Sequence, residues 1–387
     1  MKSKFITLKL GIKNNKIDGL LISLSKESTT QLISTLNKFA AAPVIISKKN
    51  ISKSNPKYIF INSGNANACT GKEGTSNTNK ILSLLAKKLT CKVSEIIIMS
   101  TGIIGRQLPI DKIEKSIRKN PFNSYSSLKQ AASAVMTTDK YPKYLSKSYK
   151  IGSKKITFSG FCKGAGMIEP NMATMLAFIE TNVSISRVKL KKYLSHCAEL
   201  SFNVISVDGD MSTNDCVAFT SNNEFEINLK NKNNEIKFLE YASDFFIKLS
   251  SKIVKDGEGA TKVIKLNIFN AKTKLDAQKI ARKISHSLLV KTAMYGEDPN
   301  WGRIIARLGS LNHIDYKAEK VELHINKMLI FTGGIQSDKC NLKLLNKSMK
   351  KNEVVVDIFL NSGSSSHSVL TSDLSHEYVH INSAYTT

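Results

Sequence analysis

The sequence lacks the features that mark several common classes of protein. It has no apolar run of the roughly 18–20 residues that a membrane-spanning helix requires, and no apolar secretory segment follows the lysines near Met1. Its six cysteines are scattered singly, without a Cys-x-x-Cys pair or a Cys/His cluster at zinc-ligand spacing. We therefore expect a soluble cytoplasmic protein with no membrane association, no metal and no disulfides. We interpret all six cysteines as small buried apolar residues.

Acidic residues are also few, 31 against 57 basic residues, which gives a formal net charge of +26. Such an excess can indicate a nucleic-acid partner. Here, however, the excess is almost entirely lysine and is spread along the whole chain. Arginine, which makes bidentate contacts with phosphates and bases, is scarce. We expect no nucleic-acid partner. A non-catalytic basic binding protein is kept as an alternative, which steeply salt-dependent nucleic-acid binding would reveal.

The 387 residues, 41% of them apolar, are enough for a sizeable core. Short apolar runs between turn residues predict strands, and apolar residues at helical spacing predict helices. The strands are expected at 6–10, 20–22, 43–46, 58–61, 96–99, within 148–158, and at 176–179, 354–359 and 378–381. The helices are expected at 76–89, 111–118, 125–137, 186–201, 236–255, 276–290 and near 339–350. Strands and helices mixed without strict alternation predict a layered α/β or α+β sandwich.

The most informative window is Lys163–Leu176, which places the pair Ala173-Thr174 at the mouth of an apolar strand. Gly164 and Gly166 allow backbone amides to approach a ligand or an anionic intermediate closely. The Lys-Gly-x-Gly element alone is weak evidence, because it lacks the phosphate-loop spacing to its Ser or Thr. Taken by itself, the window is better explained by a turn that leads into a core strand.

The same window resembles the signature of the glutamate/ornithine N-acetyltransferase family, whose members cleave themselves at an Ala–Thr bond in such a run. The resemblance extends across nearly the whole chain, with further motifs in family order. These are Ala41–Val44 (an early strand in the family), Asn62–Asn67, Ser100–Gly105, Met136–Asp139, Val207–Asp215, Asp256–Lys262, Gly296–Arg303 and Tyr378–Thr387. The resemblance implies an N-terminal-nucleophile-like sandwich built from two chains of one precursor. An alpha chain of residues 1–173 and a beta chain of residues 174–387 would intertwine in one globular unit.

The resemblance makes Thr174 the nucleophile, and elementary chemistry explains why it would begin a chain. A threonine hydroxyl needs a base, and a chain-terminal threonine supplies its own α-amine. That amine titrates at roughly 7.7–8 in short peptides, so a useful fraction is neutral at cytoplasmic pH. Cleavage between Ala173 and Thr174 would create the base and expose the nucleophile in one event. The family role of Thr101 and Gly102 is the oxyanion hole, where a hydroxyl and a backbone N–H stabilise the tetrahedral intermediate.

The substrates implied by the resemblance are N-acetylornithine and glutamate, with acetyl-coenzyme A as an alternative donor and no cofactor. Lys163 suits a substrate carboxylate, and Glu258 suits a cationic amine. The implied substrate-binding residues are Thr137, Lys163, Thr174, Glu258, Asn382 and Thr387. The resemblance also implies a heterotetramer of two alpha and two beta chains. An N-terminal-nucleophile amidohydrolase or aminopeptidase, which passes the acyl group to water, is the alternative enzyme.

Overall fold

The computed structural model describes residues 1–169 and 175–384 and divides the chain into two compact units. Within the described residues, unit 1 comprises 1–203 and 210–253, and unit 2 comprises 204–209 and 254–384. The residues Ala173, Thr174 and Thr387 lie outside the described residues. No helix in the described part of the chain is both long enough and apolar enough to cross a bilayer.

Unit 1 contains two β-sheets. Sheet 1 has the order β1-β2-β4-β5, with β4 and β5 parallel and the other pairs antiparallel. Its strands are β1 (Lys4–Leu8), β2 (Gly19–Ser23), β4 (Tyr58–Asn65) and β5 (Ile96–Ile103). Sheet 2 has the order β3-β10-β8-β7-β6. Its strands are β3 (Thr29–Ser34), β6 (Lys143–Ile151), β7 (Lys154–Lys163), β8 (Leu176–Val183) and β10 (Cys216–Phe225).

The inner faces of the two sheets share one apolar core. Phe5 of sheet 1 packs edge-on against Phe161 and Phe178 of sheet 2, with ring centroids 6.2 Å and 6.0 Å apart. Buried residues of two inner helices, α1 (Ala42–Lys53) and α4 (Leu128–Ala134), join this core. Successive strand residues point to opposite faces, so Ile59 and Ile61 face this core.

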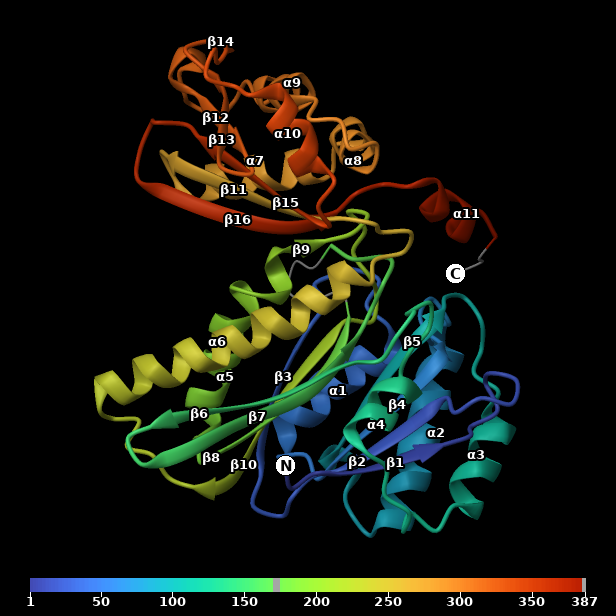
Figure 1. Ribbon diagram of the computed structural model, residues 1–387. Coiled ribbons are helices and arrows are strands. Elements are labelled where there is room, and N and C mark those ends of the chain that lie inside the picture. Colours follow the sequence, from blue (N-terminus) through green and yellow to red (C-terminus); the bar gives the residue numbers. More distant parts are fainter. Residues whose placement is uncertain (170–174, 385–387) are drawn as a thin grey trace. The chain divides into compact units, whose positions relative to one another are not determined.

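Helices cover the two outer faces of unit 1 (Figure 1). Residues of α2 (Gly71–Leu89) and α3 (Ile110–Lys119) pack with Phe60 on the outer face of sheet 1. On sheet 2, α6 (Lys232–Lys255) contributes Phe238, whose ring lies 5.5 Å from that of Phe158, and α5 (Arg187–Glu199) lies beside it. The resulting order of helices, sheet, sheet, helices confirms the predicted layered sandwich.

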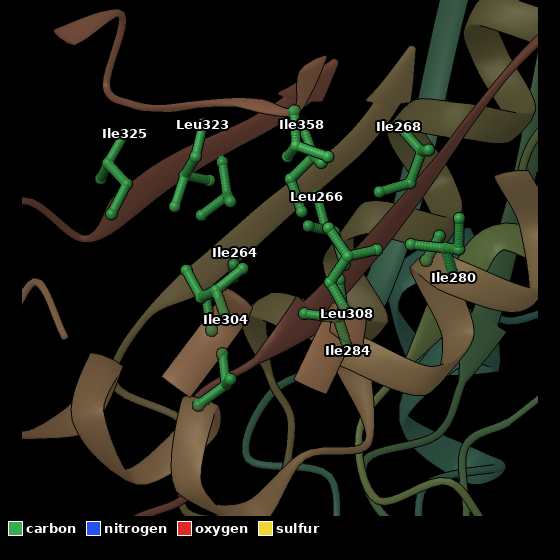
Figure 2. Packing of buried hydrophobic residues seen from close by; sticks show 14 of the residues in the cluster. Ile264, Leu266, Ile268, Ile280, Ile284, Ile304, Leu308, Leu323, Ile325 and Ile358 are labelled. Atoms are coloured by element: carbon green, nitrogen blue, oxygen red, sulfur yellow. The ribbon is translucent and has the colours of Figure 1, made fainter. Parts of the chain in front are cut away.

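Unit 2 is built on a seven-stranded sheet of order β14-β13-β12-β15-β11-β16-β9. Its strands are β9 (Ile205–Ser206), β11 (Val263–Ala271), β12 (Glu322–Ile325), β13 (Met328–Thr332), β14 (Ile335–Gln336), β15 (Glu353–Phe359) and β16 (Ser365–Ser372). Its helices are α7 (Lys274–Ser285), α8 (Leu288–Tyr295), α9 (Trp301–Gly309), α10 (Leu342–Met349) and α11 (His376–Ala384). Figure 2 shows aliphatic side chains of β11, α7 and α9 packed together in its core. Outside the helices and strands, short 3-10 turns occur in unit 1 at Val93–Glu95, at Phe202–Val204, where the chain passes from unit 1 to unit 2, and in unit 2 at Ala318–Lys320.

Two predicted strands are helices. Residues 43–46 form the first turns of α1, where Pro43 is favourable because the first helical N–H groups have no intrahelical acceptor. This also corrects the expected early strand at Ala41–Val44. Residues 378–381 lie in α11, where the Ser375 hydroxyl accepts a hydrogen bond from Tyr378 N at 3.3 Å. Both runs are four residues long, and so short an apolar run fits either structure.

Three further boundaries differ from the expected ones. The single helix predicted at 276–290 is two helices, because Ser287 caps the second one by accepting from Val290 N. The helix predicted at 125–137 is limited to α4, which begins at the capping residue Ser127. The strand predicted within 148–158 is a hairpin of β6 and β7, which turns at Gly152 with φ at +59°.

Candidate active site

Three of the predicted site residues meet in unit 1. Lys163 ends β7, Thr101 lies near the end of β5, and Thr137 follows α4. The Lys163 ammonium donates hydrogen bonds to Thr101 Oγ1 at 3.1 Å and to Thr137 Oγ1 at 2.8 Å. Lys163 and Thr101 are each only 8% exposed. A buried lysine that donates to two threonine hydroxyls from separate elements is typical of a functional site and not of a solvated surface charge.

The predicted oxyanion residue Gly102 occupies a position that only glycine fits. Its φ is +131°, and it pairs in register with Gly64 of the parallel strand β4. A Cβ at position 102 would lie 2.3 Å from the carbonyl carbon of Gly64 and 2.5 Å from the Asn65 nitrogen. The Asn214 side chain fixes the ends of both strands by donating to Ala66 O at 2.6 Å and Ser100 O at 2.9 Å. The ends of β4 and β5 are therefore held in close contact.

Asp139 organises this site, although it was not among the predicted site residues. Its Oδ1 accepts from Lys143 Nζ at 2.6 Å and from Gly164 N at 2.7 Å, and its Oδ2 accepts from Thr137 N at 2.9 Å. Burial alone would raise the pKa of this carboxyl, but Lys163, Lys143 and the Gly164 N–H outweigh it and hold the pKa at about 2. Asp139 thus fixes both Thr137 and the residue after Lys163. The only signal was its place at the end of the Met136–Asp139 motif.

Lys13 is a second residue that sequence reasoning missed. It lies in the loop between β1 and β2, and its ammonium donates to Met136 O at 2.7 Å. Burial, followed by the charge of Lys163, lowers its pKa to about 8, although Asp18 and Asp139 act in the opposite direction. In a chain with so many lysines, no local pattern distinguishes this one.

Met175, the first described residue after the predicted nucleophile, lies against the turn that follows Lys163. Ala173 and Thr174 lie outside the described residues, and the described chain resumes at Met175. The next residue, Leu176, is the register partner of Lys163 in the antiparallel pair β7–β8. The Met175 Cβ lies 3.4 Å from where a Cβ on Gly164 would be. Lys163 is therefore opposite the segment that begins immediately after Thr174.

Glu258 and Asn382 meet in unit 2. Asn382 Nδ2 donates to Glu258 Oε2 at 2.9 Å, and Glu258 is buried. The next residue, Gly259, has φ at +67°, and a Cβ there would lie 2.3 Å from the Tyr378 nitrogen of α11. This close approach seats the start of α11 beside the turn that carries Glu258. The described members of the predicted set thus form one group in each unit.

The described residues also bear on the predictions about metal ions and cysteines. Within residues 1–169 and 175–384, no group of three or more His, Cys, Asp or Glu side chains is arranged to hold a metal ion. The prediction that all six cysteines are buried is wrong for Cys69, which is exposed, and for Cys91 and Cys340, which are half-buried. The buried ones are Cys162, Cys197 and Cys216.

Comparison with known proteins identifies the family. The profile of the ArgJ family matches residues 4–387, nearly the whole chain. The arginine biosynthesis bifunctional protein ArgJ of Lactococcus lactis is 39% identical over 386 residues, covering 97% of this chain and 94% of its own length. The protein of the same name from Caldanaerobacter subterraneus is 37% identical over 390 residues, covering 97% of this chain and 95% of its own. The chain belongs to the ArgJ family.

A solved structure agrees with this assignment. A chain of the arginine biosynthesis bifunctional protein ArgJ from Bacillus halodurans is 30% identical and superposes with a TM-score of 0.51. The superposition covers 55% of this chain and 100% of the solved chain. The expected family, the layered α/β fold and the enzyme class, an acyltransferase of arginine biosynthesis, are confirmed.

Proposed function

We propose that this enzyme transfers an acetyl group from N-acetylornithine to glutamate through an acetyl ester on Thr174, giving ornithine and N-acetylglutamate. The observation that carries the residue roles is the Lys163 cluster. It joins Thr101 and Thr137 opposite the strand that begins just after Thr174. Membership in a family named for arginine biosynthesis supports the substrates.

The proposal includes cleavage between Ala173 and Thr174. Thr174 Oγ attacks the Ala173 carbonyl, the peptide becomes an ester by an N→O acyl shift, and water hydrolyses the ester. The fragments are residues 1–173 and 174–387. The length of the solved relative fits this division, because that whole chain covers 55% of this chain, and residues 174–387 are 214 of 387 residues, the same share.

In the first half-reaction, Thr174 Oγ attacks the acetyl carbonyl of N-acetylornithine and its proton passes to the Thr174 α-amine. The tetrahedral oxyanion is stabilised by Thr101 and by the backbone N–H of Gly102. Because Thr101 Oγ1 accepts a hydrogen bond from Lys163, its own hydroxyl hydrogen can be donated to the oxyanion. The intermediate collapses, ornithine leaves with the proton as the free amine, and the acetyl group remains as an ester on Thr174.

In the second half-reaction, the amine of glutamate attacks the ester carbonyl. The α-amine takes a proton from the attacking nitrogen and returns it to Thr174 Oγ as the ester bond breaks. N-acetylglutamate leaves, and the enzyme is restored. In this proposal Thr137 and Lys163 in unit 1, and Glu258, Asn382 and Thr387 in the rest of the chain, bind the polar groups of the two amino acids.

A second donor is part of the proposal. The word bifunctional in the names of the relatives supports a further activity, for which we propose acetyl-coenzyme A as donor with the same Thr174 ester as intermediate. We also propose a heterotetramer of two alpha and two beta chains, as the family resemblance implies, and a cytoplasmic location.

Thr174 provides the test. Thr174→Ala should leave one uncut chain without transfer activity, because it removes the nucleophile of both reactions. Thr174→Ser should cut and transfer slowly, since serine lacks the methyl group that restricts χ1, and misplacing a nucleophile by an ångström lowers rates by about a hundredfold. Intact-mass measurement should give two fragments for the natural enzyme. With N-acetylornithine alone, the fragment that begins at Thr174 should gain ~42 Da, one acetyl group.

The same experiment separates the alternatives. Release of acetate instead of N-acetylglutamate would identify the amidohydrolase. An alanine variant that is cut normally and still makes N-acetylglutamate would exclude Thr174 as the nucleophile.

A further inference from the structure

Lys13 reaches the Lys163 site from a loop that is itself rigidly held. The Asp18 carboxylate accepts hydrogen bonds from the backbone nitrogens of Leu10 at 2.5 Å, Ile12 at 2.7 Å and Lys13 at 2.8 Å. Ser63 N donates to Asp18 O at 2.9 Å, which fixes the loop on β4. The position of Lys13 is therefore set by the fold.

The side chain of Lys13 lies against Gly64, the residue that pairs with the predicted oxyanion residue Gly102. Its Cγ is 2.9 Å and its Cε is 3.3 Å from where a Cβ on Gly64 would be, and Gly64 is the register partner of Gly102. The ammonium then reaches Met136 O. The next residue, Thr137, accepts from Lys163. Two ammonium groups thus bind neighbouring residues of one turn.

The charges around this turn do not cancel. Asp139 is ion-paired with Lys143, and both side chains are fully buried. The Asp18 carboxylate is turned to the backbone of its own loop. Among the described residues that are not exposed, Lys13, Lys143 and Lys163 stand against Asp18 and Asp139, which leaves one positive charge, and the exposed Lys16 adds to it. Such a balance favours a ligand that brings one more carboxylate than ammonium.

We infer that Lys13 is a specificity-determining residue, whose positive charge selects an acidic amino acid over a neutral one in the second half-reaction. This inference rests on the proposed function. The acceptor glutamate carries a side-chain carboxylate, whereas the donor N-acetylornithine carries a side-chain ammonium. A cation beside the site therefore favours the acceptor and gives no advantage to the donor. Glutamine, which has the shape of glutamate without the charge, is the natural probe.

The test compares kcat/KM for glutamate and for glutamine as acceptors at saturating N-acetylornithine. Lys13→Met keeps the apolar stem over Gly64 and removes the charge, so the glutamate-to-glutamine ratio should fall about tenfold, mainly through a higher KM for glutamate. Lys13→Arg should keep the ratio within about threefold of the natural one. The acetylation step, read as ornithine release, should be lowered less than the transfer to glutamate, because the side chain of the donor carries no carboxylate. Lys9→Met, an equal charge change at an exposed position of the same loop, is the matched control.

The pH dependence supplies a readout that a purely structural lysine would not give. The groups that act on Lys13 are Asp18 and Asp139, which favour its charged form, and Lys163 and Lys16, which oppose it. Lys13 is charged below its pKa of about 8 and neutral above it, so the ratio should fall as the pH rises through about 8. In Lys13→Arg this fall should disappear, because arginine stays protonated.

Each outcome decides the matter. A folded Lys13→Met with an unchanged ratio would overturn the inference, as would identical pH profiles for the natural enzyme and Lys13→Arg. If Lys13→Met does not fold, the pH comparison still decides. If the natural enzyme makes no N-acetylglutamate at all, the proposed function has failed, and this result is seen before any variant is made.

Discussion

Replacing Asp139 by asparagine tests whether the buried carboxylate holds the site together. Each carboxylate oxygen accepts from donors: Oδ1 from Lys143 Nζ and Gly164 N, and Oδ2 from Thr137 N. Asparagine has nearly the same shape but only one oxygen. Whichever way its amide is turned, its NH2 group faces another donor. We therefore expect Asp139→Asn to lose stability and to disturb both Thr137 and the backbone after Lys163.

The structure gives the size of this effect. Asp139 and Lys143 are 2.6 Å apart with no side-chain exposure, and removing one partner of a buried ion pair costs about 3–5 kcal/mol. The lowered pKa of Asp139 gives a second value for the free energy that its carboxylate contributes. A folded pKa of about 2 against an ordinary 3.8 corresponds to about 2 kcal/mol at neutral pH. The second value is smaller because it counts ionisation only, and not the mismatched donors of the amide.

The sign of the pH dependence follows from the lowered pKa. The carboxylate stabilises the fold above the unfolded pKa near 3.8, and this contribution is lost as the pH falls toward 2. At pH 2 about half of the natural Asp139 side chains are protonated in the folded protein, and most of this contribution to stability is gone. The difference in stability between the two proteins should therefore be large at pH 7 and much smaller at pH 2.

Urea unfolding should be followed by pulsed hydrogen exchange in peptides from β6 and β7, because the single tryptophan, Trp301, reports on unit 2. Glu114→Gln is the matched control. Glu114 also pairs with a cation four residues away, Arg118, but the Arg118 side chain is exposed and that of Glu114 is only half-buried, so about 0.5 kcal/mol or less is expected. Equal losses of unfolding free energy in Asp139→Asn and Glu114→Gln would refute the reasoning. A difference between the natural protein and Asp139→Asn that does not shrink from pH 7 to pH 2 would refute it as well.

Two further changes test the two residue groups. Gly102→Ala brings a Cβ to 2.3 Å from the Gly64 carbonyl carbon at a φ of +131°, so acetyl transfer should fall about a hundredfold or more in initial-rate assays. Gly105 also has a positive φ, but a Cβ there has nothing within 4 Å, so Gly105→Ala should lower acetyl transfer far less. Equal losses of activity in the two variants would argue against the close approach to Gly64 as the cause. Glu258→Ala should weaken acetyl transfer while the chain still cuts itself, as read on a denaturing gel. Asn382→Ala should behave similarly, because Asn382 bonds Glu258; uncut Glu258→Ala protein would assign Glu258 to maturation instead.

The strands with strong apolar character were predictable because they are buried on both faces. Ile96–Met99 and Tyr58–Ile61 are continuous apolar runs, and both faces of sheet 1 are covered. Residues 43–46 and 378–381 were not predictable, because a four-residue run does not distinguish strand from helix. There the outcome depends on neighbours distant in sequence, such as Gly259 beside Tyr378.

Some residues of the candidate site were likewise predictable from the sequence, and others were not. Lys163, Thr101 and Thr137 were found because each stands in a motif of recognisable order, and the structure brings them together. Asp139 and Lys13 act on the site through contacts that the sequence does not contain. A buried aspartate and a surface aspartate look alike in a sequence, and so do two lysines. Only the fold shows which carboxylate has lost its water and which ammonium lies beside another.

The strand order of sheet 2 decides how this protein is assembled. Strands β8 and β10, which follow residue 174, are inserted between β3 and β7, which precede it. While the chain is continuous, these strands find each other by an intramolecular reaction whose rate does not depend on concentration. After the proposed cleavage, regaining the same sheet from the unfolded state would require an encounter of two molecules, and mass action works against it in dilute solution. For the proposed cleavage this means that the sheet forms before the cut, and that the cut makes later unfolding a one-way event at low concentration.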